Sequence, residues 1–208
     1  MDWIPTADEK KARYEQPHGE LDERGQVRRG NAAYAAGLAL LMAGDDNAPA
    51  WFMRAAEAWR ESWNGGESWG RPVGALKASL LARDDRAVET FAAWPLELGA
   101  ETSESPIARY AAALALLSLG RWPDARHVAE SLRNRDDFPQ DVADALAYIA
   151  ADDVVGYLEA VESVVESFET REEYLEEMPV ADTALVLQEL AWRRGVEHAL
   201  PASPVLPG

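Results

Sequence analysis

The spacing of prolines and glycines most constrains what this chain can fold into. Prolines stand where a first helical turn would begin, and Gly44, Gly120 and Gly195 close apolar runs. No segment has the sustained alternation or β-branched enrichment of a strand. We therefore predict an all-α fold. The prolines are Pro49, Pro72, Pro106, Pro123, Pro139 and Pro179, and the predicted helices span about 26–43, 49–63, 72–83, 85–94, 106–119, 123–133, 139–151, 153–177 and 180–194.

The predicted helices come in pairs joined by short polar turns. Similar junctions recur as LLMAGDD at 40–46, LLARDD at 80–85, LLSLGRW at 116–122 and YIAADD at 148–153. Counted from Asp45 to Asp84, Arg121 and Asp152, they are 39, 37 and 31 residues apart, close to the tetratricopeptide period of about 34. Residues 108–132 also resemble one tetratricopeptide unit. We predict antiparallel helix pairs stacked in a right-handed, tetratricopeptide-like array that makes residues 26–208 a single helical-repeat-like domain.

Residues 1–25 lack this pattern. They carry mixed charge, contain Pro5, Pro17, Gly19 and Gly25, and show little periodicity. Such composition is typical of a poorly anchored terminus. We predict a loosely ordered N-terminal arm.

The composition limits the kinds of partner. The 208 residues have a formal net charge of −17, which repels phosphate backbones and anionic lipid surfaces, so neither nucleic acid nor a membrane is expected. The absence of cysteine excludes disulfides and cysteine-based metal sites. No apolar run approaches the length of about 18 residues that a membrane span needs, and the first residues lack an apolar signal core, so a cytoplasmic protein is expected.

The basic residues are almost all arginine. Only Lys10, Lys11 and Lys77 are lysines among 20 basic residues. An acid-rich, lysine-poor surface suits the cytoplasm of a halophile, where salt screens charges over a few Å. An acidic protein encoded by a GC-rich genome has the same composition, and the two explanations stay open.

Catalytic signatures are sparse. The three histidines, His18, His127 and His198, lie in different segments, and no glycine-rich phosphate loop or metal-binding histidine motif occurs. Arg121 and His127 match the spacing seen in the helical ribonucleases called HEPN domains, but Arg121 precedes Pro123 and so falls in a turn. We expect no enzyme, no cofactor and no metal site. A HEPN-like ribonuclease or another small helical enzyme is the alternative, and convergence of Arg121 with His127 in an open cleft would favour it.

The charged residues on the first helices of the early pairs are all basic. These helices carry Arg28 and Arg29, then Arg71, Lys77 and Arg83, then Arg109, while the acids lie elsewhere. In stacked pairs the first helices line the inner wall. We predict that this wall binds an acidic peptide or a small anion through Trp69, Arg71, Lys77, Arg109 and Tyr110.

Two of these assignments have a structural alternative. Lys77, the only lysine beyond residue 11, is flanked by Val73, Leu80 and Leu81 on a helix, so it forms either a structural ion pair or an anion site. The loop at 64–72, with Trp69 and Arg71, leads into a helix N-terminus that favours anions, yet it also fits a turn covering the end of the stack. Trp59 and Trp63 share a helical face and are expected in the core.

The last third of the chain carries a family resemblance. A helix ending ESFETREEYL at 166–175, a helix VADTALVLQELAWRRG at 180–195 and a tail ASPVLP at 202–207 resemble the Imm49 family of predicted immunity proteins. The resemblance implies a helical, repeat-like protein that binds a toxin. We therefore predict a non-catalytic interaction protein that neutralises or scaffolds a protein partner, with the glutamate face of 153–177 as a second surface for a basic partner.

Overall fold

The computed structural model describes residues 1–16, 22–66, 68–196 and 198–208, and within them every regular element is helical. The prediction of an all-α fold is confirmed. The elements are α1 (Trp3–Glu15), α2 (Glu23–Met42), α3 (Ala48–Glu61), α4 (Gly70–Ala82), α5 (Asp85–Glu97), η1 (Ala100–Thr102), α6 (Pro106–Ser118), α7 (Trp122–Arg133), α8 (Gln140–Ala151), α9 (Val154–Glu169), η2 (Leu175–Glu177) and α10 (Asp182–Arg194), where η marks a 3-10 helix.

The four predicted junctions share one backbone geometry. Each places a left-handed residue after the first helix, at Gly44, Arg83, Gly120 or Asp152. The next amide then bonds the carbonyl five residues back, with N–O distances of 2.9, 3.4, 2.9 and 3.0 Å. This is the Schellman ending, which satisfies carbonyls that a helix terminus leaves free. The repeated sequence motif therefore corresponds to a repeated helix stop.

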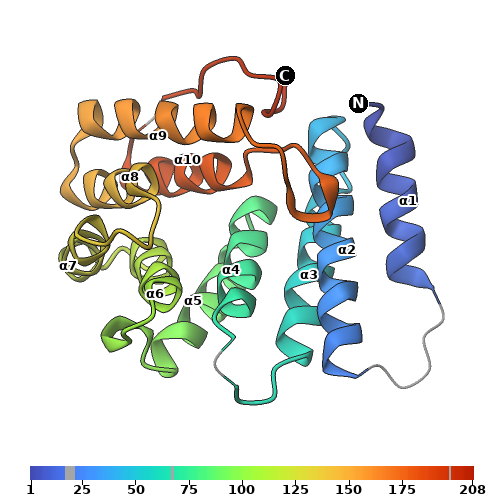
Figure 1. The fold of residues 1–208 in the computed structure, drawn as a ribbon, viewed down its shortest axis with the longest axis horizontal. Helices are drawn as coiled ribbons and strands as arrows, with labels where there is room; N and C mark the ends of the chain where they lie inside the picture. The colour runs from blue at the N-terminus through green and yellow to red at the C-terminus, as the bar shows by residue number, and fades with distance from the viewer. Residues whose placement is uncertain (17–21, 67, 197) are drawn as a thin grey trace.

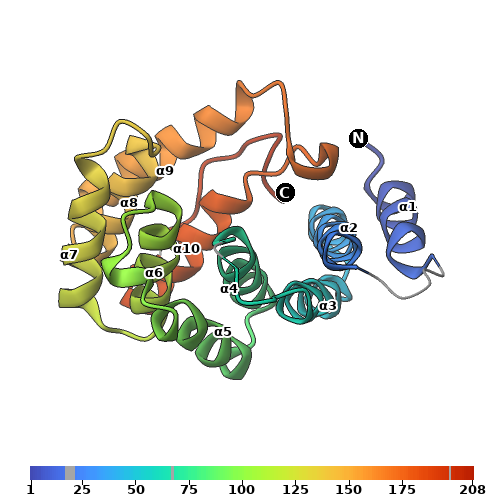
Figure 2. The same cartoon turned by 60° about the horizontal axis from the view of Figure 1, so that its bottom comes forward.

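Helices pack mainly against their neighbours in sequence. Beyond these contacts, α4 packs on α6 and α6 on α8. The helix α10 also packs on elements far from it in sequence, because it contacts α4, α6 and α8 (Figures 1 and 2). Part of the surface of α4, α6 and α8, which were predicted to line an inner wall, is therefore covered by α10. The right-handed, tetratricopeptide-like arrangement stays a prediction.

The N-terminal segment differs from the expected loose arm. Residues 3–15 form α1, which packs along α2 with Ala7 and Lys10 buried. The Tyr14 ring lies edge-on to Trp51 at 5.4 Å between centroids, and the Arg29 guanidinium stacks over it at 4.3 Å. Later residues of the predicted arm belong to α2, whose first turn is capped by Asp22. Residues 17–21, which include His18, lie outside the described residues.

The helix predicted over 153–177 ends early, at Glu169. The connection that follows, residues 170–181 (hereafter the strap), crosses to α2 through η2. Glu176 and Glu177 have left-handed φ values of 55° and 62°, which no continuous α-helix contains. The Arg13 Nη1 atom lies 2.7 Å from Glu176 Oε2 and ties the strap to α1.

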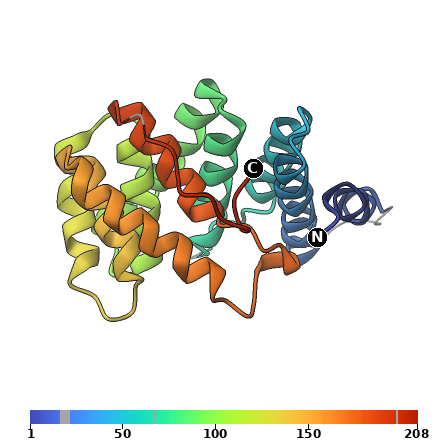
Figure 3. The ribbon, with the colours of Figure 1, turned by 90° about the horizontal axis from the view of Figure 1, so that it is seen from above.

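The chain after α10 runs back along that helix (Figure 3). The Ala181 amide donates to the Val205 carbonyl at 2.8 Å, and Val205 and Leu206 are buried. The tail therefore fixes the start of α10 and the end of the strap.

Candidate functional site

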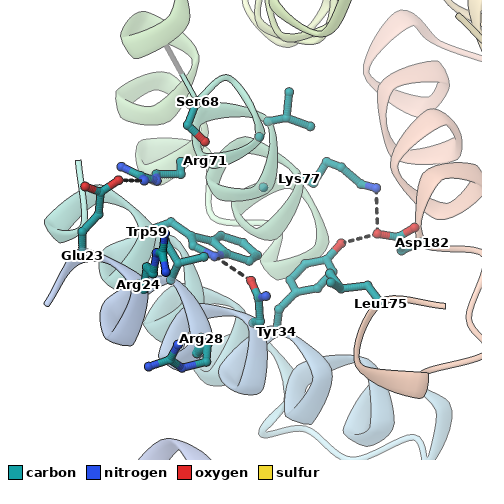
Figure 4. A pocket seen from close by; sticks show the side chains of 15 residues that line it. Glu23, Arg24, Arg28, Tyr34, Trp59, Ser68, Arg71, Lys77, Leu175 and Asp182 are labelled. Atoms are coloured by element: carbon teal, nitrogen blue, oxygen red, sulfur yellow. Dashed lines mark hydrogen bonds and ion pairs between the residues drawn. The ribbon is translucent and has the colours of Figure 1, made fainter. Parts of the chain in front are cut away.

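A cavity of about 700 Å³ lies between α2 and α4 (Figure 4). It is lined by α2, α3, α4, η2 and the first residue of α10. In the described part of the chain, α2 and α4 make no contact comparable to that of α4 with α6 or α6 with α8. The cavity therefore occupies the place where later first helices pack directly on one another. Its volume is within the range of ligand sites.

Missing side chains on α4 explain why this space is open. Gly70 and Gly74 both line the cavity, one helical turn apart. A Cβ atom at Gly70 would meet nothing within 4 Å, whereas one at Gly74 would lie 2.8 Å from the Trp59 ring. Trp59 is similarly close to Gly30 of α2 and donates from Nε1 to Asn31 Oδ1 at 3.1 Å. The indole is thus wedged between two helices and forms an apolar wall of the cavity.

The inner end of the cavity is a closed polar cluster. Lys77 Nζ lies 2.7 Å from Asp182 Oδ2 and donates to Thr183 Oγ1 at 3.1 Å, and the Tyr34 hydroxyl donates to Asp182 Oδ2 at 2.8 Å. The Lys77 and Asp182 side chains are only 12% and 16% exposed. This cluster joins α2 and α4 to the start of α10.

Burial and charge set the protonation of this cluster. Burial opposes the charge on Lys77, but Asp182 and Tyr110 together outweigh it, so the pKa of Lys77 lies above its ordinary value. Burial, and then the Asp182 carboxylate, raise the pKa of Tyr34 well above its ordinary value. At neutral pH the ammonium is charged and bound to the carboxylate, so it offers little to a ligand.

The outer end of the cavity carries the available positive charge. Arg71 pairs with Glu23 and donates from Nη1 to the Ser62 carbonyl at 2.9 Å. Arg24 and Arg28 lie one turn apart on α2, both exposed, and neither forms an ion pair with a described residue. Figure 4 shows them on the side of Arg71, opposite Lys77 and Asp182. The helices α2 and α4 also both begin here, and their N-termini favour anions.

A second cavity, of about 450 Å³, has the opposite charge. It lies at the far ends of α2 and α4, where Asp45, Asp46 and Glu189 line it with a single cation, Arg83. Arg83 Nε is itself 3.1 Å from Glu189. Cations therefore outnumber carboxylates around the first cavity, and carboxylates outnumber cations around the second.

The structure brings together two of the five predicted site residues. Arg71 and Lys77 line the first cavity, whereas Trp69, Arg109 and Tyr110 do not. Trp69 is half-buried against the core. Arg109 donates from Nε to the Ser103 carbonyl at 2.7 Å. Tyr110 is buried with its ring 5.5 Å from Phe138, and burial raises its pKa despite the opposing effect of Lys77. For Lys77, the structure shows the ion pair that the sequence left as one of two readings.

Most residues that line the cavity were not among the predicted site residues, and three of them show why. Arg24 lay within the presumed arm, and Trp59 was assigned to the core, where its 5% exposure indeed places it. Asp182 lies on a helix far along the chain, so no local pattern links it to Lys77. Arg24 and Arg28 could have been found from their four-residue spacing, which places them on one face of a helix that begins at residue 23.

The residues of the nuclease alternative do not line this cavity. Arg121 donates two hydrogen bonds to Asp124 Oδ2, at 3.0 and 2.8 Å, and His127 is exposed on α7. Among the described residues, no group of three or more His, Asp or Glu side chains is arranged to hold a metal ion. No described helix combines the length and apolarity needed to cross a bilayer.

The chain matches no protein-family model, no curated protein and no solved structure. The resemblance to the Imm49 family stays a prediction.

Proposed function

We propose that the protein is a non-catalytic binding protein of the helical-repeat type that recognises an acidic segment of a protein partner. One observation carries this proposal. Arg24 and Arg28 stand without a described acidic partner at the rim of a cavity of about 700 Å³, in a chain whose net charge is −17. The cationic rim attracts an anionic ligand, whereas the acidic surface of the rest of the protein repels it.

The lining supports binding rather than chemistry. No described histidine lines the cavity, and its lysine, aspartate and tyrosine are bonded to one another. A general base must be available to the substrate, whereas the Asp182 carboxylate is already engaged by Lys77 and Tyr34. Holding a partner's acidic segment would suit the neutralising or scaffolding role that the family resemblance implies.

Selection from a displayed random peptide library on the full chain tests the proposal. We expect the retained peptides to be enriched in aspartate and glutamate. Arg24→Gln combined with Arg28→Gln should reduce their binding about tenfold, since each exposed ion pair contributes roughly 0.2–1 kcal/mol.

The matched control replaces two arginines far from the cavity. Arg86→Gln with Arg126→Gln changes the net charge equally, because both residues are exposed and neither lines the cavity. This variant should bind the peptides as the unmodified chain does. Retained peptides without acidic residues, equal losses in both double variants, or no retained peptides at all would refute the proposal.

A further inference from the structure

We infer that the acidic segment carries a bulky apolar side chain next to its acid. The apolar group inserts between Trp59, Val73 and Leu175, while the acid stays outside at Arg24 and Arg28. This inference rests on the proposed function and adds the composition and orientation of the ligand.

The inner cations are not available to an acid. Lys77 is held by Asp182 and Thr183, and Arg71 by Glu23 and the Ser62 carbonyl. An acid that displaced Asp182 from Lys77 would leave a second carboxylate in a site that is 16% exposed. Exchanging one paired carboxylate for another gains nothing and leaves a charge without its partner. The acid therefore binds where the cations are exposed.

The middle of the cavity is apolar. Val27 and Val73 face it from α2 and α4, Trp59 forms one wall, and Gly70 and Gly74 contribute backbone only. A carboxylate placed here would lose its hydration without gaining a partner, which is unfavourable. An apolar group would be stabilised by its transfer out of water. The space between the charged ends thus selects an apolar group.

Leu175 is the clearest sign of a missing apolar contact. It lines the cavity and yet remains 55% exposed, which is high for a leucine beside a hydrophobic recess. Its position is fixed by the strap, because the neighbouring Glu176 is bound to Arg13 at 2.7 Å. A ligand side chain lying between Leu175 and Trp59 would cover both.

The size of the effects also requires an apolar contribution. Two exposed arginine contacts contribute at most about fivefold each in affinity. Burying one large apolar side chain contributes roughly ten- to a hundredfold. A segment that used only its acids would bind weakly, so the apolar group supplies the larger share of the affinity.

Three fluorescein-labelled synthetic peptides in a glycine-serine frame test this inference by fluorescence anisotropy on the full chain. One contains phenylalanine followed by aspartate and glutamate. The second has alanine in place of phenylalanine, and the third has asparagine and glutamine in place of the acids. We expect the first to bind at least tenfold more tightly than either of the others. Only the first two should weaken further as ionic strength rises.

Two substitutions locate the apolar contact. Leu175→Ser should weaken the phenylalanine peptide about tenfold and leave the alanine peptide unchanged. A Cβ atom at residue 70 would meet no atom within 4 Å, so Gly70→Phe should be accommodated. Its ring should fill the cavity and abolish binding. Gly70→Ala is the control and should bind normally, and circular dichroism confirms that each variant is folded.

The outcomes separate the two proposals. Equal binding of the phenylalanine and alanine peptides, or no effect of Leu175→Ser on either, overturns the inference while the proposed function stands. Equal binding of the acidic and neutral phenylalanine peptides overturns the proposed function. Absence of binding by all three peptides overturns both.

Discussion

Removing one partner of the Lys77–Asp182 pair should destabilise the fold more than the loss of an ordinary surface ion pair. Lys77→Met leaves the Asp182 carboxylate with the Tyr34 hydroxyl as its remaining close donor, in a site that is 16% exposed. Breaking a fully buried pair costs about 3–5 kcal/mol. Because both side chains keep some solvent contact and Tyr34 still donates, we expect about 3 kcal/mol. Asp182→Asn should cost a similar amount, since it leaves the ammonium unpaired.

The pair should also be energetically coupled. If the two single substitutions remove the same interaction, the double variant should cost about 3 kcal/mol rather than about 6, a coupling near the upper end for contacting residues. Urea denaturation followed by circular dichroism measures these free energies. For a chain of this size each single substitution should lower the Tm by roughly 6–12 °C.

Arg121→Met provides the control. Arg121 pairs with Asp124 at 2.8 Å, but the two side chains are 46% and 55% exposed. Its loss should change stability by less than about 1 kcal/mol. The reasoning about burial fails if Lys77→Met costs no more than this control, or if the two single costs simply add in the double variant.

Further predictions concern pH, the glycines and the strap. Burial raises the pKa of Tyr34, and Asp182 raises the pKa of Lys77 despite burial. The protonated tyrosine and the charged lysine therefore stabilise the fold fully below about pH 10. This stabilisation is lost as the pH rises through their folded-state pKa values. Thermal melts in an alkaline series should show this fall, and Tyr34→Phe should flatten it; identical profiles would contradict the assignment. Gly74→Ala should destabilise by about 1–3 kcal/mol in urea because its Cβ would lie 2.8 Å from an indole ring, whereas Gly70→Ala should be neutral or slightly stabilising. Arg13→Gln should speed amide hydrogen exchange in the strap while changing the global free energy of unfolding by less than about 1 kcal/mol; unchanged exchange would show that this pair does not hold the strap.

Most helices are predictable from the sequence because the signals that end them are local. Gly120 with its left-handed φ of 69° ends the α6 region where predicted, and Pro106 begins it. Arg83 and Asp152 adopt the same left-handed conformation although they are not glycine. At these two positions the repeated junction motif, and not a glycine, predicts the end of the helix. The extension of α9 was wrong because Glu172–Glu177 are good helix formers, while the apolar period that anchors the helix stops at Phe168.

The missed features depend on contacts between distant residues. Trp3, Ala7, Lys10 and Tyr14 do follow steps of three and four, but mixed charge hid this face, and only docking on α2 gives it a partner. The carboxylate that holds Lys77 lies on α10, and the cavity exists because α2 does not contact α4 as α4 contacts α6. The pairing of Lys77 with Asp182 has no local sequence signal, and Gly70 and Gly74 alone do not show that α2 stays apart from α4.

The position of α10 has a consequence for biosynthesis. Helices α4, α6 and α8 emerge from the ribosome before α10, and the faces that α10 covers remain uncovered until α10 itself has been made. Closing so long a loop is entropically slow, so the final docking step is expected late in folding. Nascent chains stalled before α10 should expose these apolar faces, bind chaperones and aggregate readily, even though most of their helices are already encoded.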